Sequence, residues 1–160
     1  MTTERMLEIC RGTMKAANYC FLISQGEGGE IHARLMLPFE PEEDMTVWFG
    51  AAANSRKVAE LSRDGRATLA FYDNKETAYV TLTGTAHLES DTEKRKKYWT
   101  DSWKDFFKNG PLGADYQLIK FVPTRIEVMN FSQNITPEPY GLVPLVLVRK
   151  GGSWEHGGND

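Results

Sequence analysis

The sequence lacks the features that mark disulfide-rich, membrane-spanning and secreted proteins. Only two cysteines occur in 160 residues, Cys10 and Cys20, and neither lies in a CxxC or Cys/His ligand spacing. We therefore expect two reduced, packed thiols rather than a disulfide or a redox pair. No apolar run approaches the roughly 18 residues that a membrane helix needs, and no signal-like segment opens the chain. These absences predict a cytoplasmic protein that does not bind a membrane.

An excess of positive charge is also missing. The 19 basic residues are outnumbered by 22 acidic ones, and the formal net charge is -3. Because a nucleic-acid backbone is attracted by a cationic surface, no nucleic-acid partner is expected. The three histidines form no ligand spacing, so no metal site is expected either. His32 is expected to be a partly buried, hydrogen-bonded structural residue, and a place near a ligand is its alternative.

What the chain does contain is a series of short strand patterns with helices between them. The segment 2–17 carries apolar residues at near-helical spacing, with Thr3 available as a cap, and predicts an amphipathic helix. The segments 19–24 and 31–37 flank the turn "QGEGGE" and predict a β-hairpin, with Ile31, Ala33, Leu35 and Leu37 on one face of the second strand. Further strands are predicted at 45–50, 66–73, 78–89 and 116–131, the last with a kink at Pro123. A helix is predicted at 54–64 and an edge strand at 142–150.

Short antiparallel strands with helices at their ends are typical of a small closed or partly closed barrel. The expected fold class is therefore mainly β (α+β). A chain of this length with 41% hydrophobic residues has room for one good core and little room for two. We expect one domain over residues 1–150, followed by a flexible tail at 151–160, "GGSWEHGGND".

The stretch "VWFGAAANSRKVAELSRD", residues 47–64, joins a predicted buried strand to a short helix and places Arg56 and Lys57 at the start of that helix. Cations normally favour the other end, because the helix dipole is positive at its N-terminus. A bound anion would explain them, since the free N–H groups of a first turn form a natural phosphate site. Together with Ser55 and with Arg34 of the hairpin, they offer enough donors for a phosphate monoester. Taken alone, "SRK" would also fit a solvated basic pair.

The order of the segments adds a resemblance. The chain reads "ARLM", then a strand ending in "WFG", then "SRK" at the start of a helix, then "TLAFY" and "YVTLTG". In this order it resembles the pyridoxamine-phosphate-oxidase-like flavoproteins, and most closely their general stress protein branch, from about Glu4 to Asn130. The resemblance implies a split β-barrel of antiparallel strands with flanking helices that binds FMN.

The resemblance also implies roles for individual residues. The residues that correspond to the family's flavin-phosphate group are Arg34, Ser55, Arg56 and Lys57. Those that correspond to positions along the isoalloxazine ring and ribityl chain are Leu35, Met36, Phe49 and Gly50, and the strand residue that approaches the ring is Tyr79 or Thr81. Catalytic residues are not indicated, so any chemistry would belong to the cofactor.

The chain departs from the family's true oxidases at the places where those enzymes hold their substrate. Pro38 and Phe39 stand where a phosphate-binding lysine is expected, and Met129 stands where a tryptophan is expected. The segment "RIEVMNFSQNITPEP" also offers no downstream arginine-histidine pair. Without those groups a phosphorylated pyridine cannot be held by the same contacts. We therefore expect the cofactor without the pyridoxamine-phosphate oxidase activity.

An aromatic insert follows the strand at 78–89. Residues 92–113 are predicted as a helix followed by "NGPLG", with Trp103, Phe106 and Phe107 on one helical face. Packing against the barrel would explain these side chains. In the resembling family, however, the flavin lies between two subunits, and aromatic area of this size usually marks an interface. We expect Trp103 to lie at a dimer interface and close to the partner's flavin.

These observations predict a homodimer with FMN at its interface, with FAD as an alternative cofactor, and a flavin-dependent oxidoreductase of unspecified substrate. One alternative is a non-catalytic protein that stores or senses flavin. Another keeps the barrel but binds haem or a deazaflavin in place of flavin. A small barrel that binds single-stranded nucleic acid through its aromatic residues is a third, which the net charge of -3 disfavours.

Overall fold

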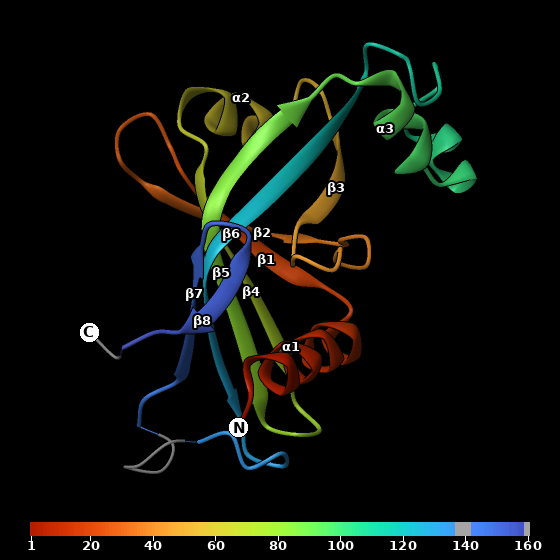
Figure 1. The fold of residues 1–160 in the computed structure, drawn as a ribbon. Coiled ribbons are helices and arrows are strands. Elements are labelled where there is room, and N and C mark those ends of the chain that lie inside the picture. The colour runs from red at the N-terminus through yellow and green to blue at the C-terminus, as the bar shows by residue number, and fades with distance from the viewer. Residues whose placement is uncertain (137–141, 159–160) are drawn as a thin grey trace.

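The computed structural model describes residues 1–136 and 142–158. It consists of one eight-stranded antiparallel sheet that curls into a split barrel, with helices at its ends (Figure 1). In chain order the elements are α1 (Thr3–Ala17), β1 (Cys20–Gln25), β2 (Ile31–Met36), β3 (Val47–Ala52), α2 (Arg56–Arg63), β4 (Arg66–Asp73), β5 (Ala78–Glu89), α3 (Thr92–Lys97), the 3-10 helix η1 (Asp101–Asp105), β6 (Tyr116–Asn130), β7 (Leu145–Lys150) and β8 (Ser153–His156). The expected fold class is confirmed.

The first helix forms where its apolar spacing predicts it. The hydroxyl of Thr2, one residue before the expected cap, accepts a hydrogen bond of 3.2 Å from the Arg5 amide and begins α1. Met6, Cys10 and Met14 lie on one face and are buried against β4 and β5. Burial raises the pKa of Cys10, and also that of Cys20, to about 12. Both thiols are free, as expected, and packed in the core.

The sheet runs in the order β2-β1-β4-β5-β6-β7-β8, and β3 pairs with the first half of β6. The long strands β5 and β6 curve together across the molecule (Figure 1). Their register shifts between Thr83 and Gly84, next to Pro123, which confirms the kink expected at this proline. A Cβ atom at Gly84 would overlap the carbonyl oxygen of Val122, so the close approach of the two backbones requires glycine.

The two faces of the hairpin strands differ from the usual pattern of apolar residues inside and polar residues outside. On β2 the apolar alternation is present, but Ile31 and Leu35 point outward and are 67% and 58% exposed. Phe21, which lies opposite Leu35, and Tyr72 of β4 extend this apolar outer face. Arg34 and His32 face the other way, toward α2. The hairpin thus carries its charge on the inner face and its exposed apolar surface on the outer face.

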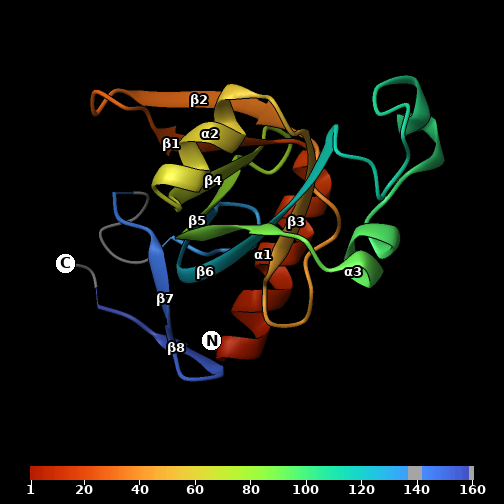
Figure 2. The ribbon, with the colours of Figure 1, turned by 90° about the horizontal axis from the view of Figure 1, so that it is seen from above.

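The aromatic insert does not form the continuous helix that its sequence pattern predicts. It consists of the six-residue helix α3 and the short η1, and it projects from one end of the barrel (Figures 1 and 2). Tyr98 ends α3, because its ring stacks on Trp48 at a centroid distance of 4.6 Å and its carbonyl accepts from the Tyr116 hydroxyl at 2.5 Å. Because of this bend, Trp103 and Phe106 do not share one face. Trp103 packs against the aromatic cluster formed by Trp48, Tyr98 and Tyr116, whereas Phe106 is 77% exposed.

The C-terminal segment also differs from the sequence-based expectation. The strand expected at 142–150 is present as β7, but part of the expected tail forms β8, which pairs with β7 at the edge of the sheet. Trp154 packs against the core, and its indole nitrogen donates to the carbonyl of Asp44 at 3.2 Å. Pairing with β7 and the Trp154 contacts order this strand, which its glycine-rich sequence did not predict. Residues 159 and 160 of the expected tail lie outside the described residues.

No helix in the described ranges is both long enough and apolar enough to cross a membrane.

Candidate functional site

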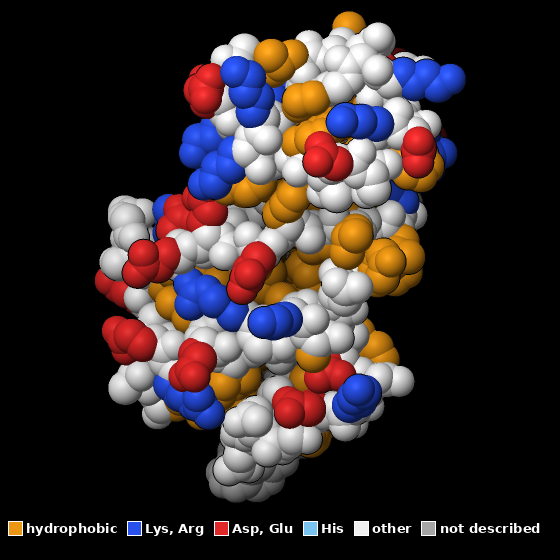
Figure 3. All heavy atoms as spheres, turned by 90° about the vertical axis from the view of Figure 1, so that its right-hand side faces the viewer, with side chains coloured by type: hydrophobic (Ala, Val, Ile, Leu, Met, Phe, Trp, Pro, Cys, Tyr) orange, Lys and Arg blue, Asp and Glu red, His pale blue; other side chains and the backbone are white. Residues whose placement is uncertain are grey.

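A groove of about 640 Å³ lies between the end of β2, the end of β3, the start of α2 and the aromatic insert. We call it the insert groove. Five of the residues that the sequence singles out line it: Leu35, Met36, Gly50, Lys57 and Trp103. Figure 3 looks onto the insert and the side of the barrel below it, where hydrophobic side chains gather. Segments far apart in the chain thus bring these five expected binding residues to one place.

Gly50 lets the insert lie directly on the barrel. A Cβ atom at this position would overlap the ring of Trp103 and would come within 3.0 Å of Tyr116. Trp103 also packs edge-on against Phe39 at a centroid distance of 5.5 Å. The glycine of "WFG" therefore admits an aromatic wall to the groove, which explains why no larger residue stands there.

The start of α2 has the properties of an anion site. Ser55 is the N-cap residue, yet its side chain caps no backbone N–H group. Its hydroxyl oxygen is buried and has no hydrogen-bond partner within residues 1–136 and 142–158. The first turn of α2 carries no acidic side chain to offset the positive end of the dipole. An unpaired buried hydroxyl and free first-turn amides together fit a phosphate group.

Lys57, two residues after Ser55, brings positive charge to the groove. Its side chain lines the groove, whereas Ser55 does not. Burial, and then the neighbouring charge of Arg34, lower the pKa of Lys57. The second effect is a repulsion between like charges. The positive charge of Lys57 in the groove would attract a bound anion.

Arg34 is oriented differently from the sequence-based expectation. Its Nη1 donates to the Ser24 hydroxyl at 2.6 Å and to the Leu22 carbonyl at 3.2 Å, and its Nη2 donates to Glu60 Oε2 at 3.0 Å. Arg34 does not line the insert groove. Both terminal nitrogens of its guanidinium group therefore form hydrogen bonds within the protein. The positive charge of Arg34 is largely balanced by Glu60.

Glu60 is a buried charged residue beside the site that sequence reasoning missed. Its carboxylate accepts from the Ser24 hydroxyl at 2.6 Å and from Arg34, and it contacts His32 Nδ1 at 2.5 Å. Burial alone would raise the pKa of Glu60, but these hydrogen bonds and the Arg34 charge lower it to about 2. His32 thus has the structural, hydrogen-bonded role that was expected of it. No local pattern indicated it: Glu60 is buried together with Val58 and Leu61, but it does not share their helical face.

The remaining expected residues lie away from the groove. The side chain of Phe49 is fully buried in the core, because β3 alternates toward the barrel interior at this position. Arg56 points along α2 to a second hollow beside the hairpin turn, with its Nε 3.5 Å from Glu60 Oε1. Tyr79 and Thr81 face the opposite side of β5 from the buried Val80 and do not line the groove.

The comparison with protein families decides the identity of this fold. The family model described as "Pyridoxamine 5'-phosphate oxidase like" matches residues 6–136, well over half of the chain. The chain belongs to this family. Within the pyridoxamine 5'-phosphate oxidase-like fold, Pro38 and Phe39 occupy the loop after β2, and Phe39 joins the aromatic cluster of the insert. A side chain packed in this way offers no charge to a phosphorylated substrate.

Solved structures share the fold at low sequence identity. A pyridoxamine 5'-phosphate oxidase-related, FMN binding protein from Nostoc punctiforme superposes with a TM-score of 0.75 at 14% identity, covering 100% of this chain and 98% of that one. A protein related to general stress protein 26 from Clostridium acetobutylicum gives 0.71 at 19% identity, covering 82% and 92%. PhzG from Burkholderia lata, solved with tetrahydrophenazine-1-carboxylic acid, gives 0.71 at 14% identity, covering 96% and 90%. The comparison with curated proteins gives no match.

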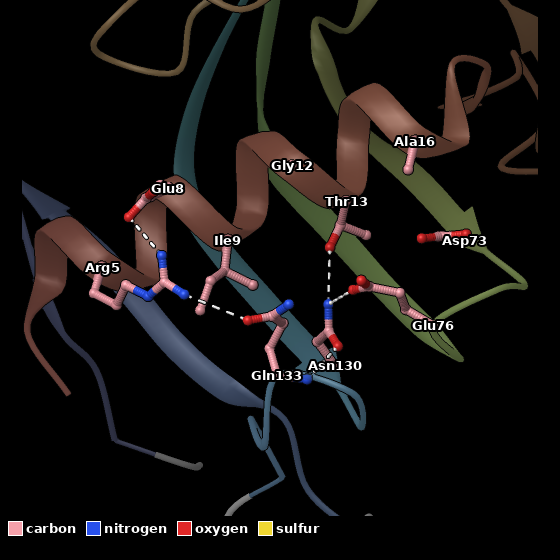
Figure 4. Close-up of a pocket in the computed structure, with 10 residues that line it drawn as sticks. All are labelled: Arg5, Glu8, Ile9, Gly12, Thr13, Ala16, Asp73, Glu76, Asn130 and Gln133. Atoms are coloured by element: carbon pink, nitrogen blue, oxygen red, sulfur yellow. Dashed lines mark hydrogen bonds and ion pairs between the residues drawn. The ribbon is translucent and has the colours of Figure 1, made fainter.

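A separate pocket lies between α1 and the end of β6 (Figure 4). Asn130 is buried there, and its side-chain amide donates to Glu76 at 2.7 Å and to the Thr13 hydroxyl at 3.4 Å. These bonds tie α1 to the β4–β5 turn and to β6. None of the expected binding residues lines this pocket. Among the described residues, no group of three His, Cys, Asp or Glu side chains is placed to hold a metal ion.

Proposed function

We propose that the protein binds FMN in the insert groove, with the phosphate at the start of α2. The observation that carries the proposal is the buried, unpaired hydroxyl of Ser55 at an N-cap beside Lys57. A phosphate there would accept from this hydroxyl, from the ammonium group of Lys57 and from first-turn amides. Family membership and the FMN-binding name of the Nostoc punctiforme neighbour support the choice of a flavin.

The apolar lining of the groove suits the rest of such a ligand. Leu35 and Met36 from β2 lie on one side and Trp103 lies on the other, with the close approach at Gly50 between them. A planar ring system gains from burial between apolar and aromatic walls. FMN is favoured over FAD because the described donors match one terminal phosphate, and FAD is a competing ligand in the test below.

A bound flavin would supply electron or hydride transfer, and this chain's own residues would bind and orient it. We infer a flavin-dependent oxidoreductase of unspecified substrate. It differs from a pyridoxamine-phosphate oxidase at Pro38, Phe39 and Met129, none of which offers a charged contact. The sequence also lacks an arginine-histidine pair in the segment 125–139, and residues 137–139 of that segment lie outside the described ranges.

We propose a homodimer in which a second copy covers the apolar outer face. Phe21, Ile31, Leu35 and Tyr72 are each at least half exposed on β1, β2 and β4, and β2 is the open edge of the sheet. This face reaches the groove, because Leu35 belongs to both. A large exposed apolar patch next to a ligand groove favours a partner that completes the groove.

The visible absorption spectrum of the protein after incubation with excess FMN and desalting tests the proposal. Retained flavin absorption bands are expected, and separate incubations with FAD, haem and a deazaflavin test the alternatives. Retention of haem or deazaflavin with loss of FMN would overturn the flavin assignment. Reduction of the retained FMN by NADH or NADPH would then favour an oxidoreductase, whereas an inert flavin would favour storage or sensing.

A further inference from the structure

The inner face of the hairpin holds a buried ionic cluster with Glu60 at its centre. The Glu60 side chain is 4% exposed, and it contacts groups from β1, from β2 and from its own helix. The nearest cations are Arg34 at 3.0 Å and Arg56 at 3.5 Å. A carboxylate so deeply buried is costly unless it is paired, and here every close partner is a donor.

Arg34 is held by more than this ion pair. Its Nη1 donates to the Ser24 hydroxyl and to the carbonyls of Leu22 and His32, and only Nη2 depends on Glu60. Removing the charge of Glu60 while keeping its shape would therefore leave Arg34 in place. What would change is the balance of charge beneath the start of α2.

We propose that Glu60 is a built-in counter-ion of the phosphate site, which masks Arg34 and thereby limits the affinity of the site for anions. The inference rests on the proposed function, because it concerns the same site. Arg34, Arg56 and Lys57 would otherwise form an uncompensated cluster at the positive end of a helix. Glu60 stabilises the protein without ligand and weakens its hold on phosphate. Because this weaker hold lowers the affinity for FMN, the bound flavin would exchange with flavin in solution.

The decisive variant is Glu60→Gln, compared with Glu60→Asp and with the matched control Glu8→Gln. Glu8 forms an exposed ion pair with Arg5 on α1, so its variant makes the same charge change far from the groove. FMN and riboflavin affinities are measured by quenching of flavin fluorescence, and melting temperatures are measured with and without inorganic phosphate.

The counter-ion role predicts that Glu60→Gln melts at a lower temperature without ligand, yet binds FMN about tenfold more tightly, a change of roughly 1.4 kcal/mol. Riboflavin affinity should stay within about twofold, since riboflavin has no phosphate to sense the charge. Glu60→Asp, which keeps the charge, should retain the parent's ratio of FMN to riboflavin affinity, as should Glu8→Gln. A purely structural role would change both flavins equally, and that result would overturn the inference, as would weaker FMN binding by Glu60→Gln.

Two further arms separate the possible failures. If the parent binds neither flavin, the proposed function fails, but phosphate should still raise the melting temperature of Glu60→Gln more than that of the parent. An equal or smaller rise in melting temperature would refute the counter-ion role of Glu60.

If Glu60→Gln does not fold, the double variant Arg34→Gln/Glu60→Gln removes both charges together. Its ratio of FMN to riboflavin affinity should stay within about threefold of the parent's, and a fall of tenfold or more would show that Arg34 is an unmasked ligand.

Discussion

At the scale of single residues, the two cations at the start of α2 differ in their position relative to the groove and in their exposure to water. Lys57 lines the groove and is partly buried, whereas the side chain of Arg56 is 68% exposed and turned toward a second hollow. A charge close to the ligand and shielded from water interacts more strongly than an exposed one. The two neighbouring cations of "SRK" are therefore not equivalent.

Lys57→Ala should weaken FMN binding about tenfold or more, because one charge-assisted hydrogen bond is worth roughly 1.5 to 3 kcal/mol. Arg56→Ala should weaken it less, by about two- to fivefold, because water screens an exposed charge. Riboflavin binding should change little in either variant. Titrations of both variants with both flavins check this, with Lys15→Ala on α1 as the control. Equal losses for FMN and riboflavin would remove Lys57 from the phosphate site.

The stability of the protein should depend on Glu60 at acid pH. Its pKa is lowered from 4.5 to about 2 in the folded chain, so its contribution is present above pH 4.5 and is lost as the pH falls toward 2. The difference in unfolding free energy between the parent and Glu60→Gln should therefore shrink over this interval. Denaturant unfolding at a series of pH values measures it. A difference that stayed constant down to pH 2 would show that the charge of Glu60 does not stabilise the fold.

Which of these residues could be predicted depends on the range of the interactions involved. Ser55, Arg56 and Lys57 are adjacent in the sequence, so a helix-start argument finds them from local pattern alone. Glu60 could not be found in this way, because its partners Ser24 and Arg34 come from two other strands. Their meeting depends on how α2 packs on the hairpin, which no local pattern encodes.

At the scale of elements, the insert shows how tertiary packing overrides a helical pattern. Aromatic residues at helical spacing predict one continuous helix, but stacking of Tyr98 on Trp48 ends α3 and bends the chain into η1. Both Trp103 and Phe106 line the groove, but Trp103 packs against the aromatic cluster, whereas Phe106 is 77% exposed. Both are aromatic and three residues apart, so they form a natural matched pair for mutation.

Trp103→Ala should release the insert from Gly50 and lower the melting temperature. A loss of about 2 kcal/mol, or roughly 4–8 °C for a chain of this length, is expected for a partly buried tryptophan. Flavin retention and dimer formation should weaken in the same variant, whereas Phe106→Ala should leave the melting temperature within about 2 °C. Thermal unfolding, sedimentation and flavin fluorescence check these outcomes. A Trp103→Ala variant that stays dimeric and keeps its flavin would assign Trp103 to ordinary packing.

At the scale of the whole molecule, the order of strands and helices was predictable and the final strand was not. The patterns from "ARLM" to "YVTLTG" repeat the order of a known family, and β2, β3, α2, β4 and β5 follow one another in that order along the chain. β8 escaped prediction because it is short and glycine-flanked, and because Trp154 finds its partner Asp44 far away in the chain. The apolar residues of β2 were recognised as one face, but only the structure shows that this face is the outer one.

The exposed outer face should make the protein dimeric, and Phe21→Glu should disrupt the dimer. A charge at this position would have to be buried against the second copy, which costs several kcal/mol without a partner. Sedimentation velocity should show a dimer for the parent and a monomer for the variant. Leu142→Glu is the control, since Leu142 is 75% exposed and belongs to none of the strands of the outer face. A dimeric Phe21→Glu protein would place the interface elsewhere.

The central claim is that the start of α2 binds the phosphate of FMN. Calorimetric titration of the unmodified protein with FMN and with riboflavin tests it most directly, because the two ligands differ only in that phosphate. Hydrogen bonds from Ser55, Lys57 and the first-turn amides should make FMN bind about 100-fold or more tightly than riboflavin. Equal affinity for the two ligands, or binding of neither, would contradict the account.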